Sequence, residues 1–419
     1  MKTTLTLALS LFSLSALSTL GACTSGNTQA SQDLSMSMDL GAGDQPDLFT
    51  LVDIAFTPPD LTLVCGHGQT MQAGSCACDS AHTISCGGAK PYCCTSTPVN
   101  QQCLPTTGSF GETRCSGPAT GRAQSLFAYN PLRGETILRT GVCDTGALDI
   151  LCTDQWRLDS VTWDPMGTVT GPSARYNSAM VFDGRNKNLF LFGGLTALNN
   201  TNAVNGEQWT YDGLTWKQLN IAGGPSARAG HAMAFDSFRA LVVLFGGAAN
   251  DITALGDTWE FDGTRWQARN TLNVPAEREA HRMVFDSKRQ RTLMFGGYVA
   301  GVPSRETWSY DGSDWTRLGD NTAMPTRADA AMAFDESRGV TVMFGGRDAL
   351  NNPLNDLWEH DGTSWQKKTV AGAPAARAAA SMTYDSARKL VLLYGGDPIV
   401  SAQLKDLWAW DGTKWTQMY

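Results

Sequence analysis

The sequence has no excess of positive charge. It contains 32 Lys and Arg against 40 Asp and Glu, which gives a formal net charge of −8. From residue 61 onward, 34 acidic and 31 basic residues nearly balance, so the chain does not carry the basic stripe of a nucleic-acid-binding protein. The sequence also contains no serine-nucleophile motif and no phosphate-binding glycine loop. We therefore predict no nucleic-acid partner, and no motif points to a serine nucleophile or to phosphate binding.

Basic residues are absent from one long segment. Residues 24–60 contain six Asp, no Lys or Arg, and few large apolar side chains. Such a segment cannot bury enough apolar surface to offset the entropy lost on ordering. We predict that residues 23–60 form a disordered acidic tether. A coil of this length spans roughly 35 Å root-mean-square, enough to hold a folded domain away from a membrane surface.

The first residues have the pattern of an export signal. Lys2 precedes an apolar run from Leu5 to Leu20, which is too short for a spanning helix with stop-transfer flanks. The run ends in Leu20-Gly21-Ala22-Cys23, which resembles a bacterial lipobox. The resemblance implies a signal peptide at residues 1–22 and lipidation of Cys23, with Thr24 favouring the outer membrane. Ordinary signal cleavage beside an incidental cysteine is the alternative.

Residues 61–118 form a cysteine-rich segment. Eight of the 11 Cys lie here: Cys65, Cys76, Cys78, Cys86, Cys93, Cys94, Cys103 and Cys115. In an exported chain this density predicts a disulfide framework that replaces a small hydrophobic core, with 105 possible pairings for eight Cys. A zinc site that includes His67 and His82 is an alternative, but the Cys-x-x-Cys pairs of zinc ribbons are missing. The segment fits either a binding module or a stalk.

The rest of the chain is an internal repeat. Gly-Gly pairs begin at Gly193, Gly246, Gly296, Gly345 and Gly395, and a Trp pair seven residues apart follows each of them. An arginine opens each copy, at Arg122, Arg175, Arg228, Arg278, Arg327 and Arg377. In the first copy, Thr140-Gly141 replaces Gly-Gly, while Trp156 and Trp163 are retained. Twelve of the 13 Trp lie at these paired positions, which excludes coincidence.

This pattern resembles the kelch repeat, in which each unit of about 50 residues forms one four-stranded blade. The resemblance implies an all-β fold, a six-bladed kelch-type β-propeller over residues 119–419. In the fourth copy we expect strands at Met283–Phe285, Thr292–Phe295 and Thr307–Tyr310, with a last strand from Asp314-Trp315. The repeat begins with a first strand and ends after a fourth, so each blade should come from one contiguous copy. Cys143 and Cys152 lie in one connection of the first blade and are expected to pair.

We name the four strands of a blade a to d. The a–b and c–d turns should then share one face, and the more variable b–c and d–a connections the other, where we expect binding. The six repeat arginines should surround the channel on that face. Four of them are candidates for binding an anionic ligand such as an acidic glycan: Arg228, Arg278, Arg327 and Arg377. Structural anchoring of each blade by its arginine is the alternative.

Other candidate binding residues lie in the same connections. His231 and His281 occupy one repeat position and could share a metal with Glu277 or Glu279, although a hydrogen-bonded structural role is the commoner one. Charged loop residues suited to polar recognition are Arg305, Arg347, Asp348, Asp397 and Lys405, whose alternative role is simple solvation. Asp329 completes the list as an acidic residue of the channel. We predict no bound metal and no cofactor.

The expected function is that of a monomeric, lipid-anchored extracytoplasmic scaffold, which binds a protein or glycan with its loop face. A carbohydrate-active kelch enzyme is the alternative. A sugar epimerase or mutarotase could use Glu279, Asp329 and His281 for acid–base chemistry, but no motif joins them. A copper-radical oxidase needs a Cys linked to a Tyr, and the only propeller cysteines are Cys143 and Cys152. We therefore assign no catalytic residue.

Overall fold

The computed structural model describes residue 118 and residues 120–145, 148–159, 162–166, 170–250, 253–320, 322–399 and 402–418. It also describes four two-residue strands upstream: β1 (Val64–Cys65), β2 (Gln69–Thr70), β3 (Ser85–Cys86) and β4 (Tyr92–Cys93). β1 pairs with β2 and β3 with β4, both antiparallel. The signal peptide and tether predicted at residues 1–60 lie outside the described residues, as does the disulfide pattern predicted for residues 61–118.

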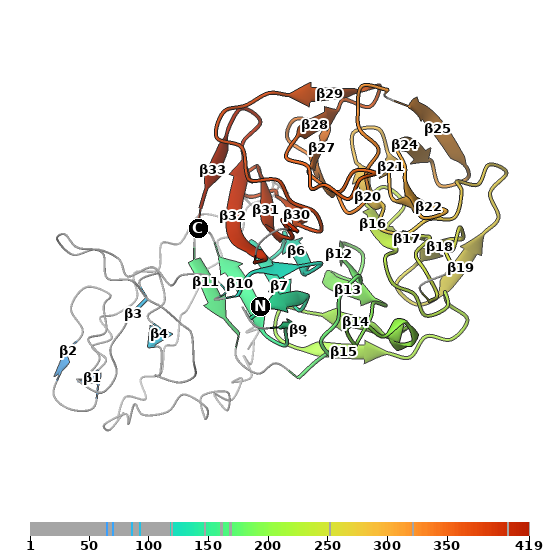
Figure 1. Cartoon of the computed structure of the whole chain (residues 1–419). Helices are drawn as coiled ribbons and strands as arrows, with labels where there is room; N and C mark the ends of the chain where they lie inside the picture. Colours follow the sequence, from blue (N-terminus) through green and yellow to red (C-terminus); the bar gives the residue numbers. More distant parts are fainter. Residues whose placement is uncertain are drawn as a thin grey trace, which may run out of the picture. The chain divides into compact units, whose positions relative to one another are not determined.

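Six antiparallel four-stranded sheets follow one another along the described part of the propeller (Figure 1). Blade 1 contains β6 (Leu126–Asn130), β7 (Glu135–Arg139), β10 (Gln155–Asp159) and β11 (Thr162–Pro165). Blade 2 contains β12 (Ala179–Asp183), β13 (Asn188–Phe192), β14 (Gln208–Tyr211) and β15 (Trp216–Leu219). Blade 3 contains β16 (Ala232–Asp236), β17 (Leu241–Phe245), β18 (Thr258–Phe261) and β19 (Trp266–Arg269).

The last three blades repeat this order. Blade 4 contains β20 (Arg282–Asp286), β21 (Arg291–Phe295), β24 (Glu306–Tyr310) and β25 (Trp315–Asp320). Blade 5 contains β26 (Ala331–Asp335), β27 (Val340–Phe344), β28 (Leu357–His360) and β29 (Trp365–Lys368). Blade 6 contains β30 (Ser381–Asp385), β31 (Leu390–Gly396), β32 (Leu404–Trp410) and β33 (Trp415–Gln417). The six-bladed all-β fold is confirmed, and the strands of blade 4 begin within about one residue of those expected.

Short elements lie in the b–c connections of blades 1, 2 and 4. β5 (Arg122–Ala123), β8 (Val142–Asp144) and β9 (Asp149–Leu151) form a small sheet beside blade 1, and β22 (Tyr298–Val299) pairs with β23 (Val302–Pro303) in blade 4. A 3₁₀ turn, η1 (Thr201–Ala203), lies in blade 2. No helix in the part of the chain described above has the length and apolar character needed to cross a membrane.

Every blade is built from one contiguous copy of the repeat, as predicted. The ring closes where blade 6 meets blade 1, without an exchanged strand (Figure 1). Ser125 Oγ and Ser381 Oγ lie 3.0 Å apart across this junction, and Tyr129 N donates to Thr383 Oγ1 at 3.3 Å. Apolar side chains of both blades share one buried cluster. In it, Trp163 packs edge-on against Tyr394, with the two ring centroids 5.4 Å apart. Gln124 N also donates to Ala379 O at 2.8 Å, so closure depends on side-chain packing and hydrogen bonds between the first and last blades.

The Trp pairs connect blades through their second member. Trp365, at the start of β29, is buried against Phe295 of blade 4, and its Nε1 donates to Thr307 Oγ1 at 3.0 Å. Trp315 makes the equivalent bond to Thr258 Oγ1 of blade 3 at 2.9 Å. Each of these two tryptophans fills the space between two sheets and satisfies its only donor on the preceding blade. Large, fully bonded side chains thereby hold neighbouring sheets together.

Candidate functional site

The repeat arginines fasten each blade internally. Arg327 is fully buried, and it donates to Gly345 O at 2.9 Å and to both carboxylate oxygens of Asp356 at 2.6 and 2.8 Å. Trp358, the first of its Trp pair, donates from Nε1 to the same carboxylate at 2.6 Å. Burial opposes the charge on Asp356, but the hydrogen bonds and charge of Arg327 outweigh it and leave the pKa of Asp356 lowered.

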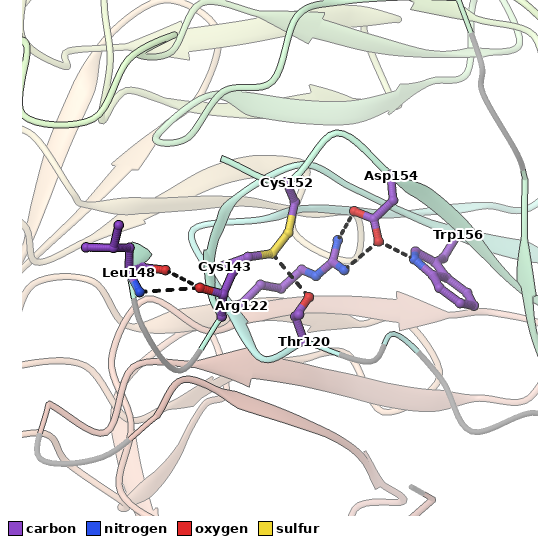
Figure 2. Close-up of a disulfide and its surroundings, with 8 residues drawn as sticks. Thr120, Arg122, Cys143, Leu148, Cys152, Asp154 and Trp156 are labelled. Atoms are coloured by element: carbon purple, nitrogen blue, oxygen red, sulfur yellow. Dashed lines mark hydrogen bonds and ion pairs between the residues drawn. A yellow bond between two sulfur atoms is a disulfide. The ribbon is translucent and has the colours of Figure 1, made fainter. Parts of the chain in front are cut away.

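An ion pair between the repeat arginine and a carboxylate of its own blade recurs in all six blades. Even in the degenerate first copy, Arg122 donates to both oxygens of Asp154, which also accepts from Trp156 (Figure 2). The structure thus places four candidate ligand-binding residues inside the blades, with exposed fractions of 0–1%: Arg228, Arg278, Arg327 and Arg377. The geometry supports the structural alternative for these arginines.

The disulfide prediction for blade 1 is confirmed. Cys143, in β8, and Cys152 are bonded, with their Cα atoms 5.7 Å apart (Figure 2). The bond closes the b–c connection of blade 1, just after the Thr140-Gly141 that replaces Gly-Gly in this copy. Thr120 Oγ1 lies 3.6 Å from Cys143 Sγ, so the disulfide also contacts the segment that enters blade 1.

A ring of backbone hydrogen bonds surrounds the channel on the loop face. Its members lie two residues after each repeat arginine, with φ between 52° and 67°: Gln124, Asn177, Gly230, Ala280, Asp329 and Ala379. In five of the six blade junctions the N–H group of one member donates to the carbonyl of the preceding member at 2.8–3.0 Å. Left-handed backbone at non-glycine residues is costly and persists where the surroundings impose it. The channel mouth is therefore a rigid frame.

A cavity of about 160 Å³ lies inside this frame. Its wall includes Gln124, Asn177 and Gly230 of the ring, together with His231 and Arg282. Polar surface predominates in this half of the channel, which suits a hydrogen-bonding ligand group.

Six polar side chains gather at the mouth over blades 4 to 6. We call them the polar arc: Glu279, Arg282, Tyr298, Asp329, Arg347 and Asp397. Arg347 Nη2 donates to Asp397 Oδ2 at 2.8 Å, and its Nε lies 3.7 Å from Asp329 Oδ2. Arg282 interacts electrostatically with Asp329, and Tyr298 with Asp329, Arg347 and Glu279. The structure therefore brings four of the predicted residues together: Glu279, Asp329, Arg347 and Asp397.

Asp329 is the most enclosed carboxylate of the arc, with an exposed fraction of 8%. Burial raises the pKa of its carboxyl group, while Arg282 and Arg347 oppose the rise. Burial also lowers the pKa of Arg282. The arc thus contains two guanidinium groups and three carboxylates. Such a site can both donate hydrogen bonds to a polar ligand and accept hydrogen bonds from it.

The arc is specific to one side of the ring. The residue that follows each Gly-Gly pair is Leu195 in blade 2 and Ala248 in blade 3, but Tyr298, Arg347 and Asp397 in blades 4 to 6. These residues form isolated bridges with the residue after each repeat arginine, as in the bridge between Arg347 and Ala328. Because the backbone is equivalent in these blades, the chemical difference comes from side chains that the repeat does not require.

Arg282 is a site residue that the sequence predictions did not include. It is the first residue of β20 and lies four positions after Arg278, where the other copies have Leu126, Ala179, Ala232, Ala331 and Ser381. Among the six copies, Arg282 is the one charged residue at the first position of strand a. Its side chain reaches the cavity wall and interacts with Asp329 of blade 5.

The remaining candidates lie apart from the arc. His231 and His281 are buried edge-on against Phe192 and Phe245, and burial lowers the pKa of His231 to about 3, so both are neutral core residues. Asp348 accepts hydrogen bonds from Leu350 N and Asn352 N within its own loop. Arg305 donates to Thr322 O at 3.3 Å. Within the described residues, no group of three or more His, Cys, Asp or Glu could hold a metal ion.

Comparison with known proteins agrees with this architecture. Residues 141–311 match the family model described as the KLHDC2/KLHL20/DRC7 Kelch-repeats domain. A solved structure titled "Structure of YjhT" superposes with a TM-score of 0.56 at 14% sequence identity, covering 71% of this chain and 97% of that chain. At this identity the likeness concerns the fold alone. No curated protein matches the sequence. Residues 141–311 therefore carry kelch repeats, and the ring of six blades is the fold of a kelch-type propeller.

Proposed function

We propose that the protein is a binding scaffold that engages a protein or glycan through the polar arc on its loop face. The observation that carries this proposal is the concentration of Arg282, Asp329, Arg347 and Asp397 at one side of an otherwise uniform ring. A rigid frame holds these side chains, and the adjoining cavity admits one small polar group of a ligand. Kelch-type architecture is used by many functions, so the proposal depends on this site and not on the fold.

Asp329 is the one observation that favours the enzymatic alternative. A carboxyl group with a raised pKa beside two arginines suits acid–base chemistry on a sugar. The predicted partner His281 is fully buried between blades, however, and cannot reach a substrate in the channel.

Charge reversal at Arg347 tests the binding role. We expect Arg347→Glu to weaken binding about tenfold or more, because it breaks the ion pair with Asp397 and places a carboxylate beside Asp329. Binding is measured with the full chain on a glycan array and by cross-linking to envelope proteins. Arg185→Glu is the matched control, since Arg185 is an exposed arginine of the a–b turn in blade 2. Equal loss of binding in both variants would contradict the proposal.

We further propose that the chain is exported and anchored to the cell envelope, at the outer membrane, through a lipid on Cys23. The support is the lipobox-like Leu20-Gly21-Ala22-Cys23 and the acidic segment that follows it. We expect Cys23→Ala to move the protein from the membrane fraction to the soluble fraction without changing its fold. Fractionation followed by immunoblotting checks this, and retention of the variant in the membrane fraction would rule out the anchor.

A further inference from the structure

We propose that the half of the channel at the a–b turn face binds a small organic ammonium ion, through aromatic side chains and the Glu336 carboxylate. This site lies at the opposite end of the channel from the polar arc, and the proposal stands independently of the function proposed above.

A second, larger cavity occupies that half of the channel. It has a volume of about 470 Å³, within the range of small-molecule sites. Every blade contributes an aromatic residue to its wall from the fourth position of its strand a, and blade 1 adds Phe127; the six are Tyr129, Phe182, Phe235, Phe285, Phe334 and Tyr384. The two cavities share wall residues such as Met233 and Met283, so they are successive parts of one channel.

The aromatic rings are held in place by neighbouring blades. A Cβ atom at Gly184 would lie 2.8 Å from Phe235 Cε1, so this ring covers the a–b turn of blade 2. Tyr384 OH accepts a hydrogen bond from Ser337 N at 3.2 Å, and Tyr129 OH accepts one from Ala387 N at 3.3 Å. Although they are fixed, Phe235 and Tyr384 are only half-buried, and both form part of the cavity wall. The wall therefore presents preorganised aromatic surface.

One side chain gives this cavity a charge. Glu336 follows Asp335 at the end of β26, where the other blades place Pro131, Gly184, Ser237, Ser287 and Ser386. Among the described residues that line the cavity, no other is charged. The Glu336 side chain lies at the solvent-exposed end of the cavity, where desolvation raises the pKa of its carboxyl group and neighbouring Asp335 raises it further. A carboxylate in this position favours a cation in the cavity.

The aromatic lining and the Glu336 carboxylate together favour one class of cation. Aromatic faces carry negative potential and attract ammonium groups, and they also pack well against alkyl groups. An organic ammonium ion satisfies both properties and neutralises Glu336. A hard metal ion would need several oxygen ligands, whereas the wall offers a single carboxylate. A neutral ligand of the same shape would gain the aromatic contacts but no charge interaction with Glu336.

Choline and its neutral isostere 3,3-dimethylbutan-1-ol provide the test. We expect calorimetric titration of the full chain to show choline binding about tenfold more tightly than the isostere, because only choline gains the charge interactions. Glu336→Gln should weaken choline binding by about threefold, as expected for a solvent-exposed charge pair, and leave the isostere unchanged. Phe285→Leu should weaken choline binding as well, by removing one aromatic face. Thermal melting of each variant verifies that the propeller is folded.

Glu277→Gln is the matched control, because Glu277 is an exposed glutamate ahead of Arg278 and outside this cavity. It loses the same unit of charge and should bind choline like the parent protein. Equal affinity for choline and the isostere, no binding of either, or equal effects of Glu336→Gln and Glu277→Gln would each overturn the proposal.

Discussion

Replacement of Gly345 by alanine should destabilise the propeller by at least about 3 kcal/mol. Gly345 has φ +66°, and a Cβ atom there would lie 2.4 Å from Arg377 O and 3.1 Å from Leu354 O, both of which are backbone atoms. Blade 5 contains Gly345, whereas Arg377 begins blade 6, so the shorter of the two clashes pushes these blades apart. The measurement is urea unfolding followed by tryptophan fluorescence, which reports on the propeller because all 13 Trp lie there.

Gly372→Ala separates the clash from the cost of a left-handed backbone. Gly372 has nearly the same φ, +67°, but no atom lies within 4 Å of the position that its Cβ would take. Its substitution should therefore cost only about 1 kcal/mol. If the two variants lost equal stability, the close approach of blades at Gly345 would not be the reason for the Gly-Gly pair.

Replacement of Arg327 by methionine should cost about 3–5 kcal/mol, because it leaves the enclosed Asp356 carboxylate without its cation. The side chains of Arg327 and Asp356 are 0% and 11% exposed, so water cannot replace the lost partner well. Gly345 O also loses its bond to the guanidinium. The same fluorescence-detected unfolding measures the loss.

Arg347→Met is the control for charge and side-chain size in the same blade. Arg347 joins Asp397 at the channel mouth, where its side chain is 16% exposed and that of Asp397 27%. We expect a loss of about 1 kcal/mol or less, as for pairs in contact with solvent. If Arg347→Met lowered the free energy of unfolding as much as Arg327→Met, the structural role of the repeat arginines would not differ from that of the polar arc.

The repeat made the fold predictable in detail. Tight turns, Trp pairs and buried arginines require the same residues in every copy, so the strands of blade 4 could be predicted from the sequence. The Cys143–Cys152 bond could be predicted because both residues lie in one connection of blade 1. The a–b and c–d turns also follow from local chemistry. In blade 3, for example, Asp262 Oδ1 accepts hydrogen bonds from Thr264 N and Arg265 N, and Gly263 has φ +90°.

The site was less predictable, because it depends on side chains that differ between copies. Arg347, Asp329 and Asp397 can be named from the sequence, but only the curvature of the ring shows that they meet. Arg282 and Glu336 lie within strongly repetitive segments, and each is the single charged residue at its repeat position. A pattern defined by the recurring residues does not identify them. Conversely, the recurring arginines attracted a functional interpretation, although burial and ion pairing occupy their guanidinium groups.

Hydrogen–deuterium exchange with and without the ligand selected on the array tests the central claim most directly. That claim is that binding occurs on the loop face over blades 4 to 6. We expect protection of the segments that carry Arg282, Asp329, Arg347 and Asp397, with no change in the a–b and c–d turns. Protection confined to the connections of blades 1 to 3, or to the turn face, would contradict it.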